Sequence, residues 1–289
     1  LTQDHIMDFH CIGYSEIDAK AVKTYCANYH PEVDGEMAMG DIVEFTSNKN
    51  NMDNLPQFDL VTGGFPCQTF SMMGKQAGFN EDRGQMFFHI IDILAVKMPR
   101  YVLLENVKNL RSHDKGRTFA RIKQELEALG YQVFTDIFNT AQFHLPQTRN
   151  RLLIFATTEP VPADFEVQFT CDNIAVLFDQ VYQDLGTYHY QSVNDILSLD
   201  VDQKYFLSER IKPTLLADGS ANFKSKSDIN MSIARPLTAT MHKMHRACQD
   251  NYYSQDFIES HGAINPVKTM TKEQLAQLPI RKLTPEEAF

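Results

Sequence analysis

Apolar segments with the pattern of strands alternate with helix-like segments through the first half of the sequence. The strand-like segments cover residues 7–15, 58–62, 101–104, 132–138 and 151–157, and the helix-like segments cover residues 19–29, 85–97 and 118–129. A helix between two strands favours parallel pairing, because the crossover returns the chain to the same edge of the sheet. The alternation therefore predicts an α/β fold with a doubly wound, mostly parallel sheet.

This pattern ends near residue 160. Pro160 and Pro162 bound a linker, and residues 161–280 contain short segments without strand and helix alternation. We therefore expect residues 1–160 to form the α/β domain and residues 161–280 to form a second, smaller and irregular domain.

A helix start is predicted in residues 281–289. Thr284 suits the N-cap, Pro285 suits the first helical position, and Glu287 completes a capping box. Because the sequence stops within this helix, we expect the natural chain to continue beyond it. We also expect a strand and a glycine-rich turn before Leu1, since a nucleotide-binding fold begins with them.

Charge is unevenly distributed along the chain. The formal net charge is −10, and residues 1–60 carry eleven Asp and Glu against three Lys and Arg. Residues 204–246 carry eight Lys and Arg against three Asp and Glu. A basic stretch in an acidic protein is either a solvated face or a surface for phosphate groups, and the sequence leaves both open.

The composition excludes several classes of protein. No run approaches the roughly 18 apolar residues of a membrane span, and the N-terminal residues lack the pattern of a signal peptide. The five cysteines are widely spaced and form no C-x-x-C pair. We therefore expect a cytoplasmic protein with reduced thiols and no metal ion.

Residues 61–71 contain the strongest candidate for a reactive group. Cys67 follows Pro66 shortly after a predicted strand, and Gly63 and Gly64 allow a tight turn before it. Ligands of open α/β sheets bind beyond the carboxyl ends of the strands, which makes Cys67 a candidate nucleophile. The alternative for Cys67 alone is a small buried side chain, which is the commoner fate of a free cysteine.

Acidic residues follow other predicted strands. Glu105 ends the strand that begins at residue 101, so we expect it at the same edge of the sheet as Cys67. Glu16 stands where a nucleotide-binding fold has an acidic residue that bonds ribose hydroxyls, with an ordinary helix N-cap as the alternative. Asp41 is a candidate for an adenine contact or for a simple Gly-Asp turn.

Four segments together resemble the DNA (cytosine-5) methyltransferase family of the bacterial type. They are GGFPCQTFS at residues 63–71, LLENVKNL at 103–110, QTRNR at 147–151 and RKLTPEEAF at 281–289. Their order and spacing match that family over nearly the whole chain. The resemblance implies a Rossmann-like methyltransferase sheet, S-adenosylmethionine as methyl donor with S-adenosylhomocysteine as product, and a target-recognition domain in residues 161–280.

The resemblance also implies chemical roles. Cys67 would attack carbon 6 of cytosine as a thiolate, which makes carbon 5 nucleophilic enough to take a methyl group. Glu105 would protonate ring nitrogen 3, Arg151 would contact the carbonyl oxygen, and Arg149 would support the site. Taken singly, a helix cap for Glu105 and strand-edge ion pairs for the arginines are alternatives. The expected cofactor contacts are Glu16, Ile17, Asp41, Ile42 and Pro66.

DNA contacts are expected from two segments. The target base must leave the stacked duplex, and the polar residues 68–83, which lack periodicity, are expected to close over it as a loop. Met73 stands where a polar groove contact is expected. The expected DNA-binding residues are Ser71, Lys75, Gln76 and Arg83 in this loop, and Arg235, Thr238, Thr240, Lys243 and Arg246 in the second domain.

We expect a monomer that acts on double-stranded DNA in the bacterial cytoplasm, either beside a cognate restriction endonuclease or as an orphan enzyme. Two alternatives stay open. A transfer-RNA cytosine-5 methyltransferase would share the cysteine and glutamate, and a non-catalytic DNA-binding fragment would fit the missing terminal motifs. A thiol protease fits poorly, because no histidine pairs with Cys67 in a recognisable pattern.

Overall fold

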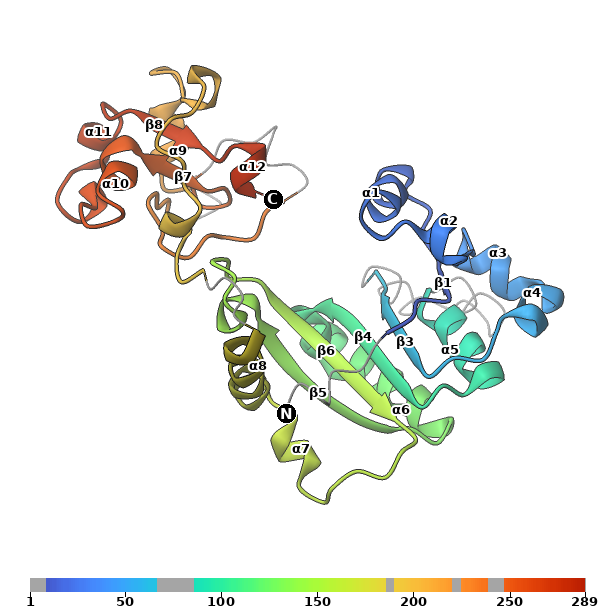
Figure 1. Ribbon diagram of the computed structural model, residues 1–289. Helices are drawn as coiled ribbons and strands as arrows, with labels where there is room; N and C mark the ends of the chain where they lie inside the picture. Colours follow the sequence, from blue (N-terminus) through green and yellow to red (C-terminus); the bar gives the residue numbers. More distant parts are fainter. Residues whose placement is uncertain (1–8, 67–85, 186–189, 220–224, 239–246, 289) are drawn as a thin grey trace. The chain divides into compact units, whose positions relative to one another are not determined.

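The computed structural model describes residues 9–66, 86–185, 190–219, 225–238 and 247–288, and the chain divides into two compact units. Unit 1 is Leu1–Phe138 with Asn150–Asp184, and unit 2 is Asn139–Arg149 with Leu185–Phe289. The elements are labelled in Figure 1. Unit 1 thus extends beyond the boundary expected at residue 160, and a short segment between two of its strands belongs to unit 2.

Unit 1 contains the alternation that the sequence predicts. Its strands are β1 (Gly13–Tyr14), β2 (Met37–Ala38), β3 (Leu60–Gly64), β4 (Tyr101–Val107), β5 (Gln132–Asn139) and β6 (Asn150–Thr157). Its helices are α1 (Ala19–Tyr29), α2 (Pro31–Asp34), α3 (Ile42–Ser47), α4 (Lys49–Asn54), α5 (Met86–Lys97), α6 (Arg117–Ala128), α7 (Phe165–Gln168) and α8 (Cys171–Leu185), with the 3-10 segment η4 (Lys108–Gly116). The helices predicted at 19–29, 85–97 and 118–129 are confirmed to within one residue.

The main sheet is mixed, so the expectation of a mostly parallel sheet is wrong. Its strand order is β3-β4-β6-β5, with β3 parallel to β4 and β4 antiparallel to β6. β6 follows β5 through ten residues, which is too short for the helical crossover that parallel pairing requires. β1 and β2 form a separate parallel pair, and of the strand predicted at residues 7–15 the described part, residues 9–15, contains a two-residue strand.

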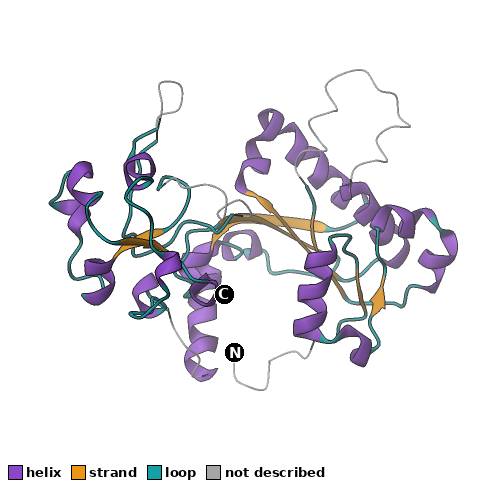
Figure 2. Ribbon diagram, turned by 90° about the horizontal axis from the view of Figure 1, so that it is seen from above, coloured by secondary structure: helices purple, strands orange, loops and turns teal. Residues whose placement is uncertain are grey.

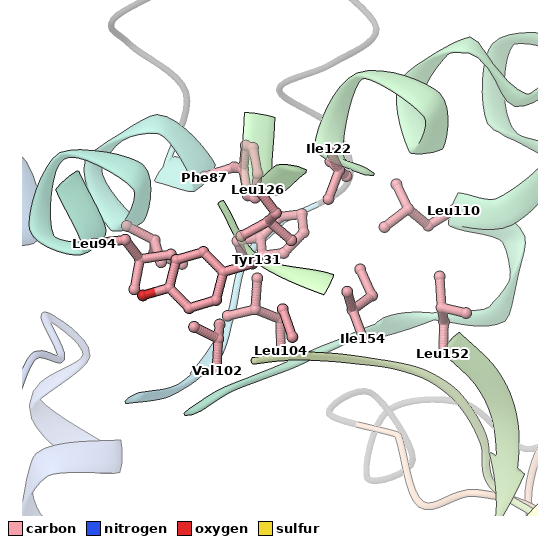
Figure 3. Close-up of a cluster of buried hydrophobic side chains, with 13 residues drawn as sticks. Phe87, Leu94, Val102, Leu104, Leu110, Ile122, Leu126, Tyr131, Leu152 and Ile154 are labelled. Carbon is pink, nitrogen blue, oxygen red and sulfur yellow. The ribbon is translucent and has the colours of Figure 1, made fainter. Parts of the chain in front are cut away.

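One face of the main sheet carries the core of unit 1. Along β4, Val102, Leu104 and Asn106 are buried, whereas the residues between them are partly exposed. Figure 3 shows the buried side chains of β4 and β6 facing those of α5 and α6, such as Phe87 and Leu126. Each buried side chain of this size contributes about 1.5–3 kcal/mol to folding. The opposite face of β4 carries Tyr101, Leu103 and Glu105, all partly exposed, and Tyr101 stacks on Phe155 of β6.

Unit 2 is irregular. Its elements are η5 (Thr140–Phe143), η6 (Val193–Asp195), η7 (Gln203–Tyr205), α9 (Lys212–Leu216), β7 (Tyr252–Ser254), α10 (Gln255–Glu259), η8 (Pro266–Lys268), α11 (Lys272–Leu275), β8 (Ile280–Lys282) and α12 (Pro285–Ala288). Loop predominates over these short elements in Figure 2, and the one strand pair recorded here is antiparallel β7 and β8. Among the described helices of both units, none is long and apolar enough to cross a membrane.

The predicted capping box at the end of the chain is confirmed. The backbone N–H of Glu287 donates to Thr284 Oγ1 at 3.2 Å, and the backbone N–H of Thr284 donates to Glu287 Oε2 at 2.8 Å. Arg281 then donates two hydrogen bonds of 2.7 Å to the same carboxylate, one from each terminal nitrogen. Both side chains are almost fully buried, so α12 is tied to β8 by an interior ion pair.

Candidate active site

The carboxyl ends of β3 and β4 lie side by side and form the centre of the candidate site. Gly64 at the end of β3 pairs with Glu105 on β4. A Cβ atom on Gly64 would lie 3.4 Å from Glu105 Oε2, in van der Waals contact with it, so the end of β3 directly borders the carboxylate. Cys67 follows three residues after Gly64 and lies outside the described residues, as do Ser71, Lys75, Gln76 and Arg83.

Glu105 forms an ion pair with Arg151. In the antiparallel pairing of β4 and β6, Glu105 is opposite Leu153 and Val107 is opposite Arg151, so the two charged side chains lie diagonally on one face. Arg151 Nε contacts Glu105 Oε1, and the side chains are 23% and 43% exposed. A half-exposed pair contributes only about 0–1 kcal/mol to stability. Its effect is to orient a carboxylate that solvent and ligands reach.

Asn106 anchors the backbone that leads to Cys67. Its side chain is on the buried face of β4, with 3% of the residue exposed. Asn106 Nδ2 donates to the carbonyl oxygen of Phe65 at 2.7 Å. Phe65 is itself buried, and its ring lies 5.3 Å from that of Phe87. The chain is therefore held by a hydrogen bond and by ring packing two residues before Cys67.

From the sequence, Asn106 was expected only to help hold its neighbour Glu105, and its bond to the Phe65 carbonyl was not foreseen. The alternation along β4 places it on the apolar face, where an amide needs a partner. A polar residue at an inward position beside Glu105 is the signal that would have identified it.

Asn106→Ala is expected to lower the rate of the reaction that uses Cys67 by about 10- to 100-fold. Without the bond from Asn106 to the Phe65 carbonyl, Cys67 is expected to shift. A shift of about 1 Å in a reacting group lowers a rate by up to about 100-fold. The measurement is the single-turnover rate under saturating substrate. Asn109→Ala, which removes an exposed amide three residues further on, is the matched control and should retain the parent rate. A parent-like rate for Asn106→Ala would contradict the anchoring role.

Arg149 and Arg151 belong to different units, although the sequence analysis treats them as one pair. The backbone N–H of Arg149 donates to Thr140 Oγ1 at 3.1 Å, and its carbonyl accepts from the backbone N–H of Thr140 at 3.2 Å. The segment before it pairs with Ala234, because Thr148 N–H donates to the Ala234 carbonyl at 2.8 Å. The QTRNR motif is therefore joined to the segment that contains Arg235.

Arg235 forms several hydrogen bonds inside unit 2. Its backbone N–H and carbonyl both bond to the side-chain amide of Asn251, at 2.8 and 3.0 Å. Its Nη1 donates to the carbonyl of Asp228 at 3.2 Å. Thr238 is exposed, and the other expected contacts, Thr240, Lys243 and Arg246, lie outside the described residues. Arg235 therefore stabilises the fold of unit 2 through its bonds to Asn251 and Asp228.

The candidate cofactor residues lie at the carboxyl ends of β1 and β2. The strands are parallel, and Ser15 Oγ donates to the Gly40 carbonyl at 2.7 Å just beyond them. Glu16 Oε1 accepts from the backbone N–H groups of Ile17 and Asp18, both at 2.8 Å. The parallel pairing of β1 and β2 therefore brings Glu16 and Asp41 to the same edge, at the carboxyl ends of the two strands.

The sequence left a helix N-cap open as the alternative role of Glu16 and a simple turn as that of Asp41. At this edge of the sheet, Asp41 is a helix cap and Glu16 is not. Asp18, and not Glu16, caps α1, because its carboxylate accepts from the N–H groups of Lys20 and Ala21. Asp41 caps α3 by accepting from the Val43 N–H at 2.8 Å. No group of three or more metal-ligating side chains occurs within the part of the chain that the structure describes.

Comparison with known proteins identifies the family. Residues 2–289 match the family described as C-5 cytosine-specific DNA methylase. The chain belongs to this family. The chain is 38% identical over 201 residues to the type II methyltransferase M.DsaV of Dactylococcopsis salina, covering 70% of this chain and 50% of that protein. It is 40% identical over 197 residues to the type II methyltransferase M1.ScrFI of Lactococcus lactis subsp. cremoris, covering 68% and 45%.

A solved structure supports the fold of the methylase. The S. pombe Dnmt2 methyltransferase superposes with a TM-score of 0.62 at 18% identity, covering 97% of this chain and 76% of that one. The chain has an α/β fold with a mixed sheet, as do the neighbours of this kind. It spans about half the length of the curated relatives it matches.

Proposed function

We propose that this methylase transfers a methyl group from S-adenosylmethionine to carbon 5 of a cytosine in double-stranded DNA. The observation that carries the proposal is the edge formed by β3 and β4. There, Glu105 is oriented by Arg151, and Asn106 anchors the Phe65 carbonyl two residues before Cys67. Family membership and the type II names of the relatives support DNA as the substrate and a place in a restriction-modification system.

The chemistry follows from the residue types. The Cys67 thiolate bonds to carbon 6 of the cytosine ring while Glu105 supplies a proton at ring nitrogen 3, so that electron density moves to carbon 5. Carbon 5 takes the methyl group and S-adenosylhomocysteine is the leaving group. A base, with solvent as the final acceptor, then removes the proton of carbon 5, the electron pair of that bond expels the sulfur from carbon 6, and nitrogen 3 returns its proton to Glu105. Arg151, which lies diagonally beside Glu105, would donate to the cytosine carbonyl oxygen. Free cysteine returns at the end of the cycle.

The side chains at the ends of β1 and β2 fit a nucleoside cofactor. Glu16 and Asp41 each use a single carboxylate oxygen in their recorded bonds to backbone N–H groups, and carboxylates suit hydroxyl and amino donors. Glu16 and Ile17 would hold the ribose, and Asp41 and Ile42 would hold the adenine. S-adenosylmethionine, when bound, supplies an electrophilic methyl group. Pro66 would pack near the reactive centre.

The target base reaches Cys67 only after it leaves the duplex, so the proposal includes base flipping. Residues 68–83 would close over the base. Unit 2 would read the DNA sequence, with Thr238 and the basic residues near it as contacts. Arg149 would support the site from the segment that pairs with Ala234.

A methyl-transfer assay tests the proposal. The protein is incubated with methyl-labelled S-adenosylmethionine and either genomic DNA lacking 5-methylcytosine or bulk transfer RNA, and the modified nucleosides are identified by mass spectrometry. The proposal predicts 5-methylcytosine in DNA. Label in transfer RNA alone would assign the activity to the RNA alternative, and DNA binding without label in either would leave a binding protein.

A further inference from the structure

The segment that follows Glu105 is basic, although the protein is acidic. Residues 108–121 contain five Lys and Arg against one acidic residue, whereas the whole chain carries a net charge of −10. The segment comprises η4 and the first turns of α6, and it begins directly after the carboxyl end of β4. It therefore starts three residues beyond the carboxylate at the centre of the candidate site.

Three of these cations have no ion-pair partner among the described residues. Arg117 pairs with Asp114, and Arg121 pairs with Glu125. Lys108, Arg111 and Lys115 are exposed and form no ion pair among the described residues, although Lys115 lies near the Asp114 carboxylate that Arg117 binds. Their charge is thus available to an anion outside the chain.

The backbone of η4 is held in an uncommon conformation. Asp114, Lys115 and Gly116 are consecutive residues with positive φ, at 50°, 59° and 85°. Such residues persist where the surroundings hold them and are concentrated at functional sites. Here Leu110 is fully buried in the core, and a hydrogen bond of 2.7 Å joins His113 Nδ1 to Thr118 Oγ1. The loop is therefore fixed in place at both of its ends.

The loop ends at a helix N-terminus that also favours an anion. Gly116 is the N-cap of the twelve-residue helix α6, and no side chain of the described residues caps its first turn, although the Arg117 N–H donates to the Asp114 carbonyl. The first turn contains no acidic residue. Uncapped amides at a helix N-terminus carry partial positive charge and bind phosphate oxygens.

We propose that η4 and the first turn of α6 bind backbone phosphates of the DNA strand that contains the target cytosine. The inference rests on the proposed function, because Glu105 would contact the base, and the phosphates of that nucleotide lie next to the base. Lys108, Arg111 and Lys115 supply the charge, and the α6 amides supply directed donors. These contacts position the strand without reading its sequence.

The test measures the salt dependence of DNA binding. The triple variant Lys108→Gln/Arg111→Gln/Lys115→Gln and the parent protein are titrated against a fluorescent random-sequence duplex at several salt concentrations. Each lost phosphate contact lowers the slope of log affinity against log salt by about 0.9. We expect the slope to fall by about 2 to 3, and the affinity at low salt to fall at least about 10-fold.

The control variant is Lys49→Gln/Lys97→Gln/Lys123→Gln, which removes the same charge from unit 1 outside this segment. Its slope of log affinity against log salt should differ from the parent slope by less than about 0.9, the value of one phosphate contact. A triple variant with the parent slope, or a control with an equal loss, would overturn the inference and leave only a solvated basic face. Inorganic phosphate is titrated in parallel. A variant-sensitive response to phosphate without any change in DNA binding would also overturn it, in favour of a free-anion site.

Failure of the inference is distinguishable from failure of the proposed function. If the parent protein methylates DNA and the triple variant binds DNA with the same slope, only the phosphate surface is wrong. If the parent protein neither binds nor methylates DNA, the proposed function is wrong. Far-ultraviolet circular dichroism of both variants shows whether the fold is retained.

Discussion

Glu287→Gln is expected to lower the free energy of unfolding of unit 2 by about 3–5 kcal/mol. The substitution keeps the shape of the side chain but leaves the guanidinium of Arg281 buried without a counter-charge, and breaking a buried pair from one side costs this amount. Glu287 also accepts the backbone N–H groups of Ser198 and Thr284, at 2.7 and 2.8 Å. One carboxylate therefore ties together β8, α12 and a loop about 90 residues away in sequence.

Urea denaturation and hydrogen exchange of unit 2 amides measure this effect. The matched control is Glu286→Gln, which changes the exposed neighbour in the same helix and should shift stability by less than about 0.5 kcal/mol. A double variant, Arg281→Met with Glu287→Leu, removes both charges and should be more stable than Glu287→Leu alone, which leaves the Arg281 charge unpaired. Equal stability of Glu287→Gln and Glu286→Gln would contradict the account.

The same carboxylate predicts how stability depends on pH. Burial alone would raise the pKa of Glu287, but the hydrogen bonds from Arg281 and from the Thr284 and Ser198 amides outweigh it and lower the pKa below 4.5. A depressed pKa adds stability above the pKa of the unfolded chain, and that stability is lost as the pH falls through the folded value. The difference in free energy of unfolding between the parent and Glu287→Gln should therefore have its largest value at pH 7 and decrease below about pH 4.5.

Glu105→Gln is expected to lower the rate of methyl transfer by about 100- to 10,000-fold. The amide keeps the size of the side chain but cannot supply the proton that general acid catalysis requires, and such catalysis contributes about this factor. DNA affinity should change little, because base binding also uses other contacts. Single-turnover rates and DNA dissociation constants, measured on the same protein, separate the two effects.

The control for Glu105→Gln lies on the same two strands at their other end. Asp59 precedes β3 and pairs with Arg100, which precedes β4, at 3.0 Å. Asp59→Asn removes a more exposed ion pair at the amino edge of the sheet, so it should retain the parent rate. A similar loss of rate in both variants would show that Glu105 acts through general stability and not through chemistry.

Local patterns allowed much of unit 1 to be predicted from the sequence. The apolar spacing of α1, α5 and α6 defines these helices, and the end of β4 was identified because Glu105 follows an apolar run. The direction of β6 was not predictable in this way, since strand direction depends on the connection after β5 and not on the pattern inside the strand. The Thr284 capping box was predicted correctly because its hydrogen bonds are local.

The contacts that the sequence did not reveal join residues far apart in the chain. Asn106 reaches Phe65 across 41 positions, and Asn251 reaches Arg235 across 16. Arg281 was part of a recognised motif, yet its complete burial depends on Ser198 and the packing of unit 2. A polar residue on a buried strand face is a visible signal, but its partner is known only from the fold.

Covalent trapping tests the central claim most directly. The protein is incubated with S-adenosylmethionine and duplex DNA carrying 5-fluorocytosine, whose carbon 5 cannot release a proton, so the bond between sulfur and carbon 6 cannot break. The account predicts an adduct that survives denaturing electrophoresis, maps by mass spectrometry to Cys67, and is absent in Cys67→Ala. Methylated DNA without any adduct on Cys67 would contradict the account.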